Sequence, residues 1–304
     1  MSLPMHFQFS QSSLQAYADC PRRFQLQYVE RVAWPAPEAQ PSLEDEKHLR
    51  LGLAFHRLVH RHLLGMSPEQ LSVTITDADL QHWWRGYLAA LAPQGVLADL
   101  PPHRYPEFFL SAPLGDYRLI ARYDLVAVSV GQRAVIVDWK TYQRRPRREH
   151  LLTGIQTRLY PYLLVRAGAE LNAGQPFLPS QVEMVYWFAH FPDQPEWFRY
   201  HPNRFQEDNA TLQALVAEIS SRDPALPWPR TRRPSRCRHC RYRSLCAREG
   251  EWSLEPDTAE TDEVDKVANE VDRISEADNN PTVPGGLDNT LGAFDFEQIA
   301  EIAF

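Results

Sequence analysis

Several features are scarce or missing in this 304-residue sequence, and each absence excludes a class of protein. Four cysteines are too few for a disulfide scaffold of this length. No stretch of about 18 apolar residues occurs, which argues against a transmembrane helix. The first ten residues, MSLPMHFQFS, contain neither a basic nor an apolar segment, so we expect no secretion signal. These absences predict a cytoplasmic protein of the reducing compartment that has no contact with a membrane.

The formal net charge of −7 combines two regions of opposite sign. Residues 251–304 carry 15 acidic and two basic residues, a net charge of −13. The preceding 250 residues hold 24 acidic and 30 basic residues, a net charge of +6. Arginine forms two dense groups in this basic part, at positions 144–148 and 230–248. Such groups are typical of solvated surface or of a polyanion-binding face, because arginine pairs well with phosphate.

The spacing of apolar residues predicts an α/β fold whose core order is helix, three strands, helix and strand. Ser12 is expected to cap a first helix, and Pro21 to restart the chain in a second helical turn. Helical periodicity predicts further helices at 44–65, 77–93, 149–167 and 203–221. Short apolar runs predict a three-strand meander and a fourth strand, with the sequences FFLSAPLG, YRLIARYDLVAV, AVIVDWK and VEMVYWFAH.

A domain boundary is predicted near residue 250, between a domain of residues 1–250 and an acidic tail of residues 251–304. Residues 251–286 are acidic and poor in aromatics, so we expect them to be disordered. Residues 291–304 have the apolar spacing of a short amphipathic peptide. Three interpretations of the tail stay open: a solvated linker, a DNA mimic that occludes the basic groove, and a docking segment for a protein partner.

Three of the four cysteines, Cys237, Cys240 and Cys246, lie within ten residues in RCRHCRYRSLC. This spacing is typical of a metal centre. With Cys20 as fourth thiolate, the set would complete a tetrahedral Zn²⁺ site or a cubane iron–sulfur cluster, which spacing alone does not distinguish. Such a site would clamp the first helix to the C-terminal segment. In the alternative, Cys20 is a buried core thiol and the triplet binds zinc with His239.

A second constellation lies in ARYDLVAVSVGQRAVIVDWKTY, which spans two predicted strands and a turn near Gly131. The alternation of side chains along a strand places Asp138 and Lys140 on one face and Trp139 on the other. The hairpin brings Asp124 beside Asp138. Two carboxylates on adjacent strands suit Mg²⁺ or Mn²⁺, and a nearby lysine would orient an attacking water. The alternative is an Asp–Lys ion pair at the end of a strand.

Four further residues have the chemistry to join this site. His56 lies in G-x-x-x-H on a predicted helix and would supply a third ligand, or is a histidine of a His-rich helix without that role. Gln156 and Tyr160 are four residues apart in Q-x-x-x-Y, so they share a helix face. Packing of Tyr160 in the core is the alternative. Glu107, in the first predicted strand, is an additional candidate carboxylate.

Taken in order, these residues resemble the iron–sulfur members of the RecB-like branch of the PD-(D/E)XK nuclease superfamily, such as CRISPR-adaptation exonucleases and the nuclease domain of AddB. The resemblance spans about residues 10–248. It rests on Cys20-Pro21, Gly52-x-x-x-His56, Asp124, Asp138-Trp139-Lys140, Gln156-x-x-x-Tyr160 and the cysteine triplet. The sequence departs from the pattern at Ala121, where many relatives have glycine, and in its acidic tail.

The resemblance implies a restriction-endonuclease-like mixed central sheet flanked by helices, with an iron–sulfur-clamped subdomain built from N- and C-terminal helices. It implies that Lys140 assists the nucleophilic water, and that Gln156 and Tyr160 line the active site and the DNA path. The four cysteines would hold a [4Fe–4S] cluster with a structural role. The implied ligands of Mg²⁺ or Mn²⁺ are His56, Asp124, Asp138 and the carbonyl of Trp139.

The predicted function is therefore metal-dependent hydrolysis of DNA by an exonuclease that acts on single strands or free ends, in repair, recombination or CRISPR-type defence. Tyr17 and Tyr242 would stack bases along the strand, or else pack in the core. Two rivals are a non-catalytic iron–sulfur scaffold subunit that binds DNA and an interaction protein with a structural zinc site. The intact set of Asp124, Asp138 and Lys140 favours the enzyme over the scaffold.

Overall fold

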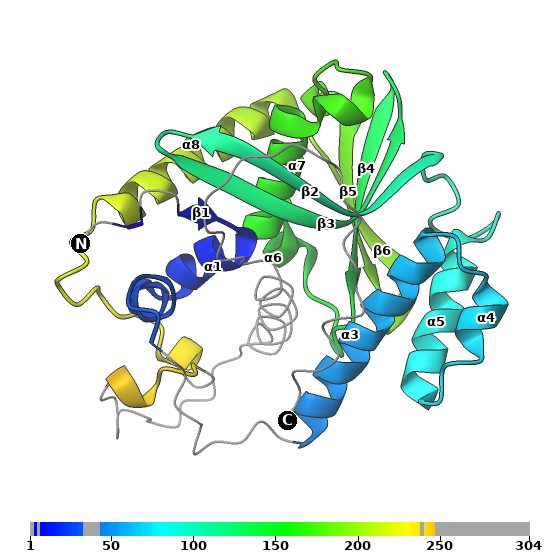
Figure 1. Cartoon of the computed structure of the whole chain (residues 1–304), viewed down its shortest axis with the longest axis horizontal. Helices are drawn as coiled ribbons and strands as arrows, with labels where there is room; N and C mark the ends of the chain where they lie inside the picture. Colours follow the sequence, from blue (N-terminus) through cyan, green and yellow to red (C-terminus); the bar gives the residue numbers. More distant parts are fainter. Residues whose placement is uncertain (1–2, 5–6, 33–42, 238–239, 247–304) are drawn as a thin grey trace, which may run out of the picture.

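The computed structural model describes residues 3–4, 7–32, 43–237 and 240–246 (Figure 1). The acidic tail and its predicted terminal peptide lie outside the described residues. The described part is a mixed α/β fold built around one six-stranded sheet, as the sequence predicts. Within these ranges, no helix combines the length and the apolar character that crossing a membrane requires.

The sheet has the strand order β1-β3-β4-β5-β6, and β2 pairs with β3 off this path. Pairing is parallel between β1 and β3 and between β4 and β5, and antiparallel elsewhere. The predicted meander and fourth strand are confirmed as β2 to β5. The strands are β1 (Gln8–Phe9), β2 (His103–Leu114), β3 (Tyr117–Ser129), β4 (Arg133–Lys140), β5 (Val182–Phe188) and β6 (Phe191–Arg199).

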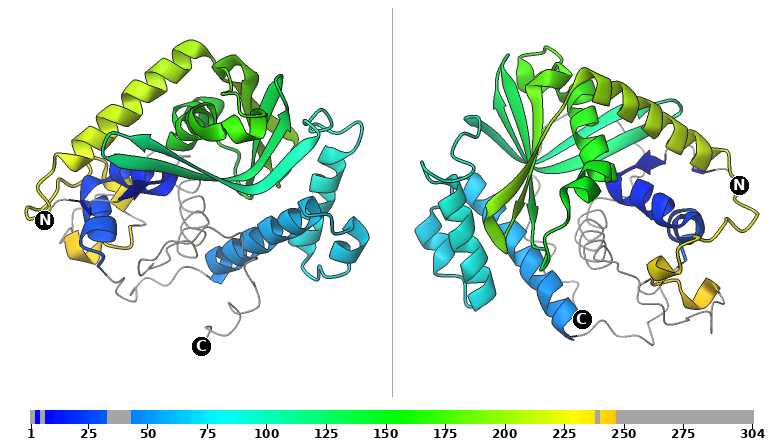
Figure 2. Two further views of the ribbon diagram at one scale, coloured as in Figure 1. Left: turned by 45° about the horizontal axis from the view of Figure 1, so that its top comes forward. Right: turned by 180° about the vertical axis from the view of Figure 1, so that it is seen from behind.

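Helices cover both faces of this sheet (Figure 2). One face packs against α7 and α8, the other against α3 and α5, and each side has its own apolar core. Along β4 the alternation is strict, because Ile136 faces the first core and Trp139 the second. The helices are α1 (Gln11–Asp19), α2 (Pro21–Phe24), α3 (Leu43–Leu63), α4 (Pro68–Ser72), α5 (Ala78–Leu91), α6 (Arg148–Thr153), α7 (Ile155–Ala167) and α8 (Pro202–Ser220).

Two expected element boundaries need correction, and one strand was not predicted. Ser10, not Ser12, caps α1, because Ser10 and Ser13 form a reciprocal capping box. The helix predicted over 149–167 is divided at Gly154, whose extended backbone separates α6 from α7. The strand β6 was not predicted, since Pro192 and Pro195 interrupt its apolar pattern. An edge strand tolerates proline because one side of its backbone needs no ladder partner.

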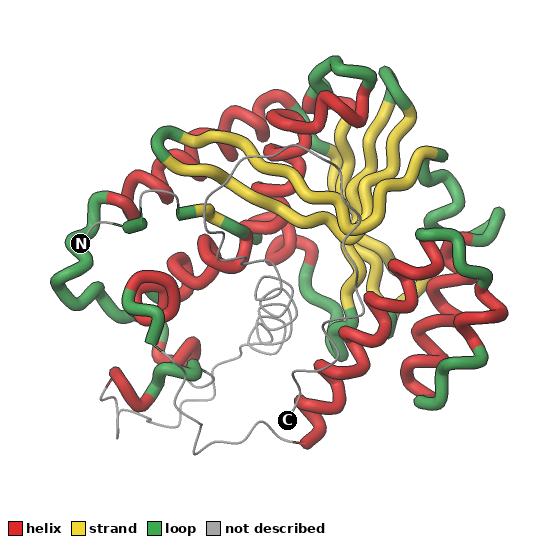
Figure 3. Tube along the Cα trace, in the orientation of Figure 1, coloured by secondary structure: helices red, strands yellow, loops and turns green. Residues whose placement is uncertain are grey.

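The sheet separates between β3 and β4, and this separation creates a place for polar side chains. β4 pairs with β3 only along residues 125–129 of β3, whereas its pairing with β5 continues to Lys140. The earlier part of β3 instead lies beside β1, at Arg118 and Leu119. Figure 3 shows the β2–β3 hairpin extending toward β1 and away from β4 and β5. Residues at the fork, Asp124 above all, therefore face polar groups instead of a paired strand.

Candidate active site

The first part of the candidate site lies on the α7 side of β4. The Nζ atom of Lys140 is 2.8 Å from Oδ2 of Asp138, and both side chains are buried. Gln156, in the first turn of α7, donates from Nε2 to Oδ1 of Asp138 at 2.5 Å. Asp138 and Lys140 therefore lie on the same face of β4, as the alternation along the strand predicts. The ammonium also lies 5.6 Å and 5.7 Å from the ring centroids of Tyr142 and Tyr186.

The second part lies at the fork and is contributed by α3 and β3. Oδ2 of Asp124 accepts a hydrogen bond from the backbone N–H of Trp139 at 2.8 Å, in place of a β3 carbonyl. Its other oxygen is 3.5 Å from Nδ1 of His56, in the middle of α3. Because pairing of Leu125 with Val137 precedes the fork, Asp124 comes level with Asp138. His56, from a helix on one face of the sheet, therefore meets Asp124 at the fork, level with Asp138 on β4.

The charges at this point shift one another's protonation. Burial lowers the pKa of His56, but Asp124, Glu107 and Asp138 outweigh this effect and raise it above the ordinary histidine value. Burial raises the pKa of Asp124, whereas His56, the Trp139 N–H and Lys140 lower it more strongly. Three carboxylates thus favour the charged form of the imidazole, and Asp124 among them is itself held in its charged form. Groups of opposite tendency at one point are typical of a functional site.

Glu107 joins this cluster through an unusual backbone conformation. Pairing on either side of it in the β2–β3 ladder places Glu107 opposite Asp124, yet Glu107 itself has φ +50°. A left-handed conformation at a non-glycine residue costs about 1–3 kcal/mol. Burial and the charge of Asp124 raise the pKa of Glu107, and its carboxylate pairs with Nε of Arg122 at 3.1 Å. A left-handed backbone and a partly buried charge therefore coincide at Glu107, which the sequence suggested as an additional carboxylate.

Other predicted residues have mixed outcomes. Trp139 directs its indole into the second core against Tyr87 and Trp187, so its backbone is what faces the fork. Tyr160 follows Gln156 by one turn of α7, and its ring packs 4.9 Å from that of Tyr123 in the first core. Stacking platforms formed by Tyr17 and Tyr242 are excluded in this conformation, because both side chains are buried.

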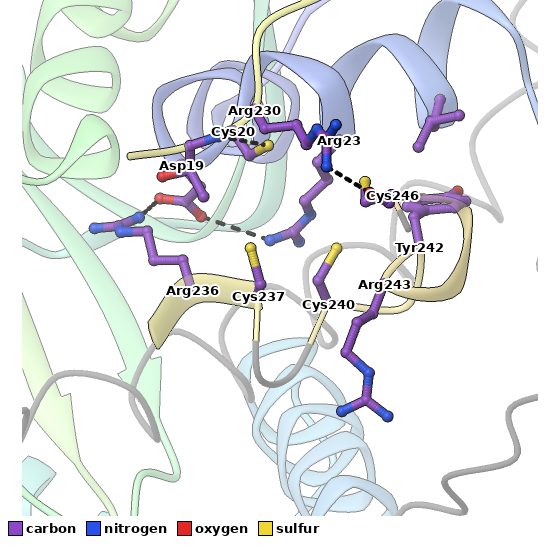
Figure 4. A pocket seen from close by; sticks show the side chains of 12 residues that line it. Asp19, Cys20, Arg23, Arg230, Arg236, Cys237, Cys240, Tyr242, Arg243 and Cys246 are labelled. Carbon is purple, nitrogen blue, oxygen red and sulfur yellow. Dashed lines mark hydrogen bonds and ion pairs between the residues drawn. The ribbon is translucent and has the colours of Figure 1, made fainter. Parts of the chain in front are cut away.

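The four cysteines line one pocket, which lies at the C-terminal end of α1 (Figure 4). Cys20 lies in the extended break between α1 and α2, and its Sγ accepts from the backbone N–H of Thr231 at 3.3 Å. Figure 4 shows the sulfurs of Cys237 and Cys240 directed toward the side on which Cys20 and Cys246 lie. Two segments more than 200 residues apart in sequence therefore meet at the thiols.

This pocket is rich in positive charge. Asp19 pairs with Arg236 and, at 3.6 Å, with Arg23. Burial raises the pKa of Cys240 and Cys246, so ionised thiols here need a further source of stabilisation. A thiolate-ligated metal centre carries net negative charge and suits arginine-lined walls. The arginines that line the pocket are Arg23, Arg230, Arg236 and Arg243.

Two polar residues that were not predicted from the sequence hold the chain after Lys140. His48, two turns before His56 on α3, places Nε2 2.7 Å from the carbonyl oxygen of Thr141. Glu196, on β6, pairs with Arg145 and with Arg148. The spacing of His48 and His56 on one helix was an available signal. No local pattern marks Glu196, because its partners lie about 50 positions earlier in the chain.

The structure thus combines a mixed sheet flanked by helices with acidic residues, a lysine and an imidazole at a fork between strands. The model of the PD-(D/E)XK nuclease superfamily matches residues 8–247, and the chain belongs to this superfamily. This confirms the predicted superfamily and its restriction-endonuclease-like fold. Membership of the iron–sulfur branch stays a prediction.

No curated protein matches this chain. Among solved structures, a predicted exonuclease from Eubacterium rectale is similar with a TM-score of 0.45 and 10% identity, covering 69% of this chain and 79% of that chain. The protein SSO0001 is similar with a TM-score of 0.36 and 14% identity, covering 79% of this chain and 85% of that chain.

Members of this superfamily use divalent metals such as Mg²⁺. Among the residues that the structure describes, no three His, Cys, Asp or Glu side chains are already arranged as a metal cage. The donors at the fork nevertheless fit a hard cation in their chemistry, since the charges of Asp124, Glu107 and Asp138 all act on one imidazole and such a cation prefers carboxylate oxygen. A cation there would relieve the mutual repulsion of the carboxylates.

Proposed function

We propose that this nuclease is a Mg²⁺- or Mn²⁺-dependent deoxyribonuclease that acts as an exonuclease on single-stranded or end-containing DNA. The observation that carries the proposal is the convergence of Asp124, Asp138, His56 and Lys140 at the fork between β3 and β4. A purely structural Asp–Lys pair would not require a second carboxylate, a raised histidine pKa and a strained Glu107 at the same point.

The chain's own groups divide the chemistry among themselves. The metal site would consist of His56, Asp124, Asp138 and the carbonyl of Trp139, and a bound cation supplies Lewis acidity and an activated water. Gln156 fixes the orientation of Asp138 through its amide N–H. Lys140, held beside Asp138, is placed to hydrogen-bond the attacking water or to balance charge on the phosphate. The proposed role of Tyr160 is to support the wall of the site by packing against Tyr123.

We propose that residues 1–250 form the nuclease domain and that Cys20, Cys237, Cys240 and Cys246 hold a [4Fe–4S] cluster. What supports this is the shared pocket, its arginine walls and the contact between Cys20 and Thr231. The cluster would clamp the first helices to the C-terminal segment. Zn²⁺ at the same four thiols is the alternative centre; the zinc set that includes His239 involves a residue outside the described ranges.

The proposed setting is the cytoplasm, in DNA repair, recombination or CRISPR-type defence. The tail, residues 251–304, is proposed to compete with DNA for the basic body or to dock a protein partner, since its charge is −13 against +6 for the rest. Deleting the tail tests this proposal. Stronger DNA binding supports competition, loss of a co-purifying partner supports docking, and no change in either leaves a linker.

Substrate choice tests the proposed function. Wild-type protein purified without oxygen is incubated with Mn²⁺ and linear single-stranded DNA, circular single-stranded DNA, blunt duplex DNA or RNA of matched sequence. We expect degradation of linear single strands and resistance of the circular form. Cleavage of circles would contradict the exonuclease, and a preference for RNA would contradict the deoxyribonuclease. Binding of linear DNA without any cleavage would favour the rival scaffold subunit.

A further inference from the structure

Four arginines occupy five consecutive positions just after the strand that carries Lys140. They are Arg144, Arg145, Arg147 and Arg148, and all four are exposed. Even with the acidic residues Glu149 and Glu196 counted, this group keeps a net charge of +2. We call residues 144–148 the arginine loop.

One buried carboxylate fastens the arginine loop to the edge strand β6. The side chain of Glu196 is 11% exposed, and it accepts from Arg145 and, at 2.5 Å, from Arg148. Arg148 also donates to the backbone oxygen of Trp197 at 2.7 Å, and its guanidinium lies 4.3 Å from the ring centroid of Phe198. A carboxylate is this deeply buried only where it is well paired. These contacts attach two of the four arginines of the loop to β6.

The beginning of the same segment is held beside the candidate active site. His48 contacts the carbonyl oxygen of Thr141, which directly follows Lys140. The guanidinium of Arg145 lies 5.9 Å from the ring centroid of Phe188, and Phe188 is the β5 partner of Lys140 in the sheet register. One arginine of the loop therefore contacts the residue that lies beside Lys140 in the sheet. Backbone phosphates next to a phosphate bound at the fork would fall within its reach.

We propose that the arginine loop binds the phosphates that flank the scissile phosphate of a nucleic acid strand, and that Glu196 is a positioning residue for this loop. The proposal rests on the proposed function, since it names the surface that feeds that active site. The exposed side chains of Arg144 and Arg147 contact the phosphates, while Glu196 holds Arg145 and Arg148. A loop ordered before binding loses less conformational entropy when it meets its ligand.

The phosphate contacts are tested with the double variant Arg144→Gln/Arg147→Gln. The control Arg118→Gln/Arg166→Gln removes the same charge from exposed positions, and Arg166 lies in the last turn of α7, at the opposite end of that helix from Gln156. Affinity for a fluorescent single-stranded oligonucleotide is measured in EDTA at several salt concentrations. We expect about tenfold weaker binding of the loop variant near 0.1 M salt, and a salt slope smaller by about 1.4, or 0.7 per lost contact. Binding and slope equal to those of the control pair would overturn the proposal.

Glu196→Gln separates positioning from simple electrostatics, because the two effects have opposite signs. Loss of a negative charge alone would strengthen binding of a polyanion. If Glu196 positions the loop, the variant binds at least about threefold more weakly in spite of its added positive charge, and Glu196→Asp recovers part of the loss. Binding as tight as that of wild type, or tighter, would refute the positioning role. Circular dichroism and thermal melting verify folding, and if Glu196→Gln does not fold, the arginine variant decides.

Binding in EDTA requires no cleavage, so the loop and the nuclease activity can fail separately. Wild-type cleavage together with unchanged binding by the arginine variant refutes the loop and leaves the proposed function intact. Conversely, if the arginine variant binds more weakly as expected but wild type never cleaves, the surface is supported and the nuclease is refuted. With substrate cleavage present, the loop variant should raise KM by a larger factor than it lowers kcat.

Discussion

Replacing Lys140 by methionine is expected to destabilise the metal-free protein strongly, because it leaves the carboxylate of Asp138 buried without its cation. The two side chains are only 8% and 5% exposed, and the charged atoms are 2.8 Å apart. Removing one partner from a buried pair costs about 3–5 kcal/mol in free energy of unfolding. Gln156 still donates to Oδ1 of Asp138, which favours the lower part of this range. For a domain of this size, the melting temperature should fall by roughly 6–12 °C.

The assay is thermal and urea unfolding in EDTA, with Lys47→Met as the matched control. Lys47 is 50% exposed and pairs with Asp77 and Asp79 at 3.5 Å, so its loss should cost no more than about 1 kcal/mol. Added Mg²⁺ should stabilise the Lys140 variant more than wild type, since the cation supplies positive charge beside Asp138. Equal melting temperatures for the Lys140 variant, the Lys47 variant and wild type would refute the reasoning.

Three further predictions concern residues around the fork and the cysteines. Gln156→Leu removes the amide donor to Asp138 and should lower Mn²⁺ affinity or the rate of cleavage about 10–100-fold. Calorimetry measures the affinity and initial rates measure the cleavage. Wild-type values of both would disprove that Gln156 orients Asp138. Because carboxylates raise the pKa of His56 above its unfolded value, its contribution to stability is complete below about pH 6.5 and is lost as pH rises through the folded-state pKa. Mn²⁺ affinity should increase over the same interval, since the metal needs the neutral ring, and a pH-independent affinity would count against His56 as a ligand. Cys20→Ser should lose iron and visible absorption in anaerobically purified protein, whereas a colourless wild type with stoichiometric zinc would replace the cluster by the alternative centre.

Local sequence patterns predicted those parts of the structure that residues close together in the sequence form. The runs that became β3 and β4 are apolar and separated by a turn at Gly131, which adopts φ +73°. That short turn fixes the register, and the register brings Asp124 level with Asp138. Alternation then places Lys140 on the same face as Asp138. The carboxylate–lysine group could therefore be predicted from the sequence alone.

The remaining features depend on contacts between distant segments. The fork exists because β4 follows β5 while β3 turns toward β1, and no single strand encodes that choice. The left-handed conformation of Glu107 is imposed by its surroundings, since glutamate has no intrinsic preference for it. Glu196 meets its arginines only after the sheet has formed. Such contacts carry no periodic signal. The carboxylate–lysine group was therefore predictable from the sequence, whereas the fork, the backbone conformation of Glu107 and the contacts of Glu196 were not.

In the proposed function, Lys140 and the carboxylates at the fork hydrolyse DNA with a divalent metal. The most direct test is a time course with end-labelled single-stranded DNA and Mn²⁺, comparing wild type, Lys140→Met and Lys47→Met at a temperature at which all three are folded. We predict cleavage by wild type and Lys47→Met, at least about 100-fold less by Lys140→Met, and none in EDTA. Cleavage that survives in the Lys140 variant, or no cleavage by folded wild type, would contradict the claim.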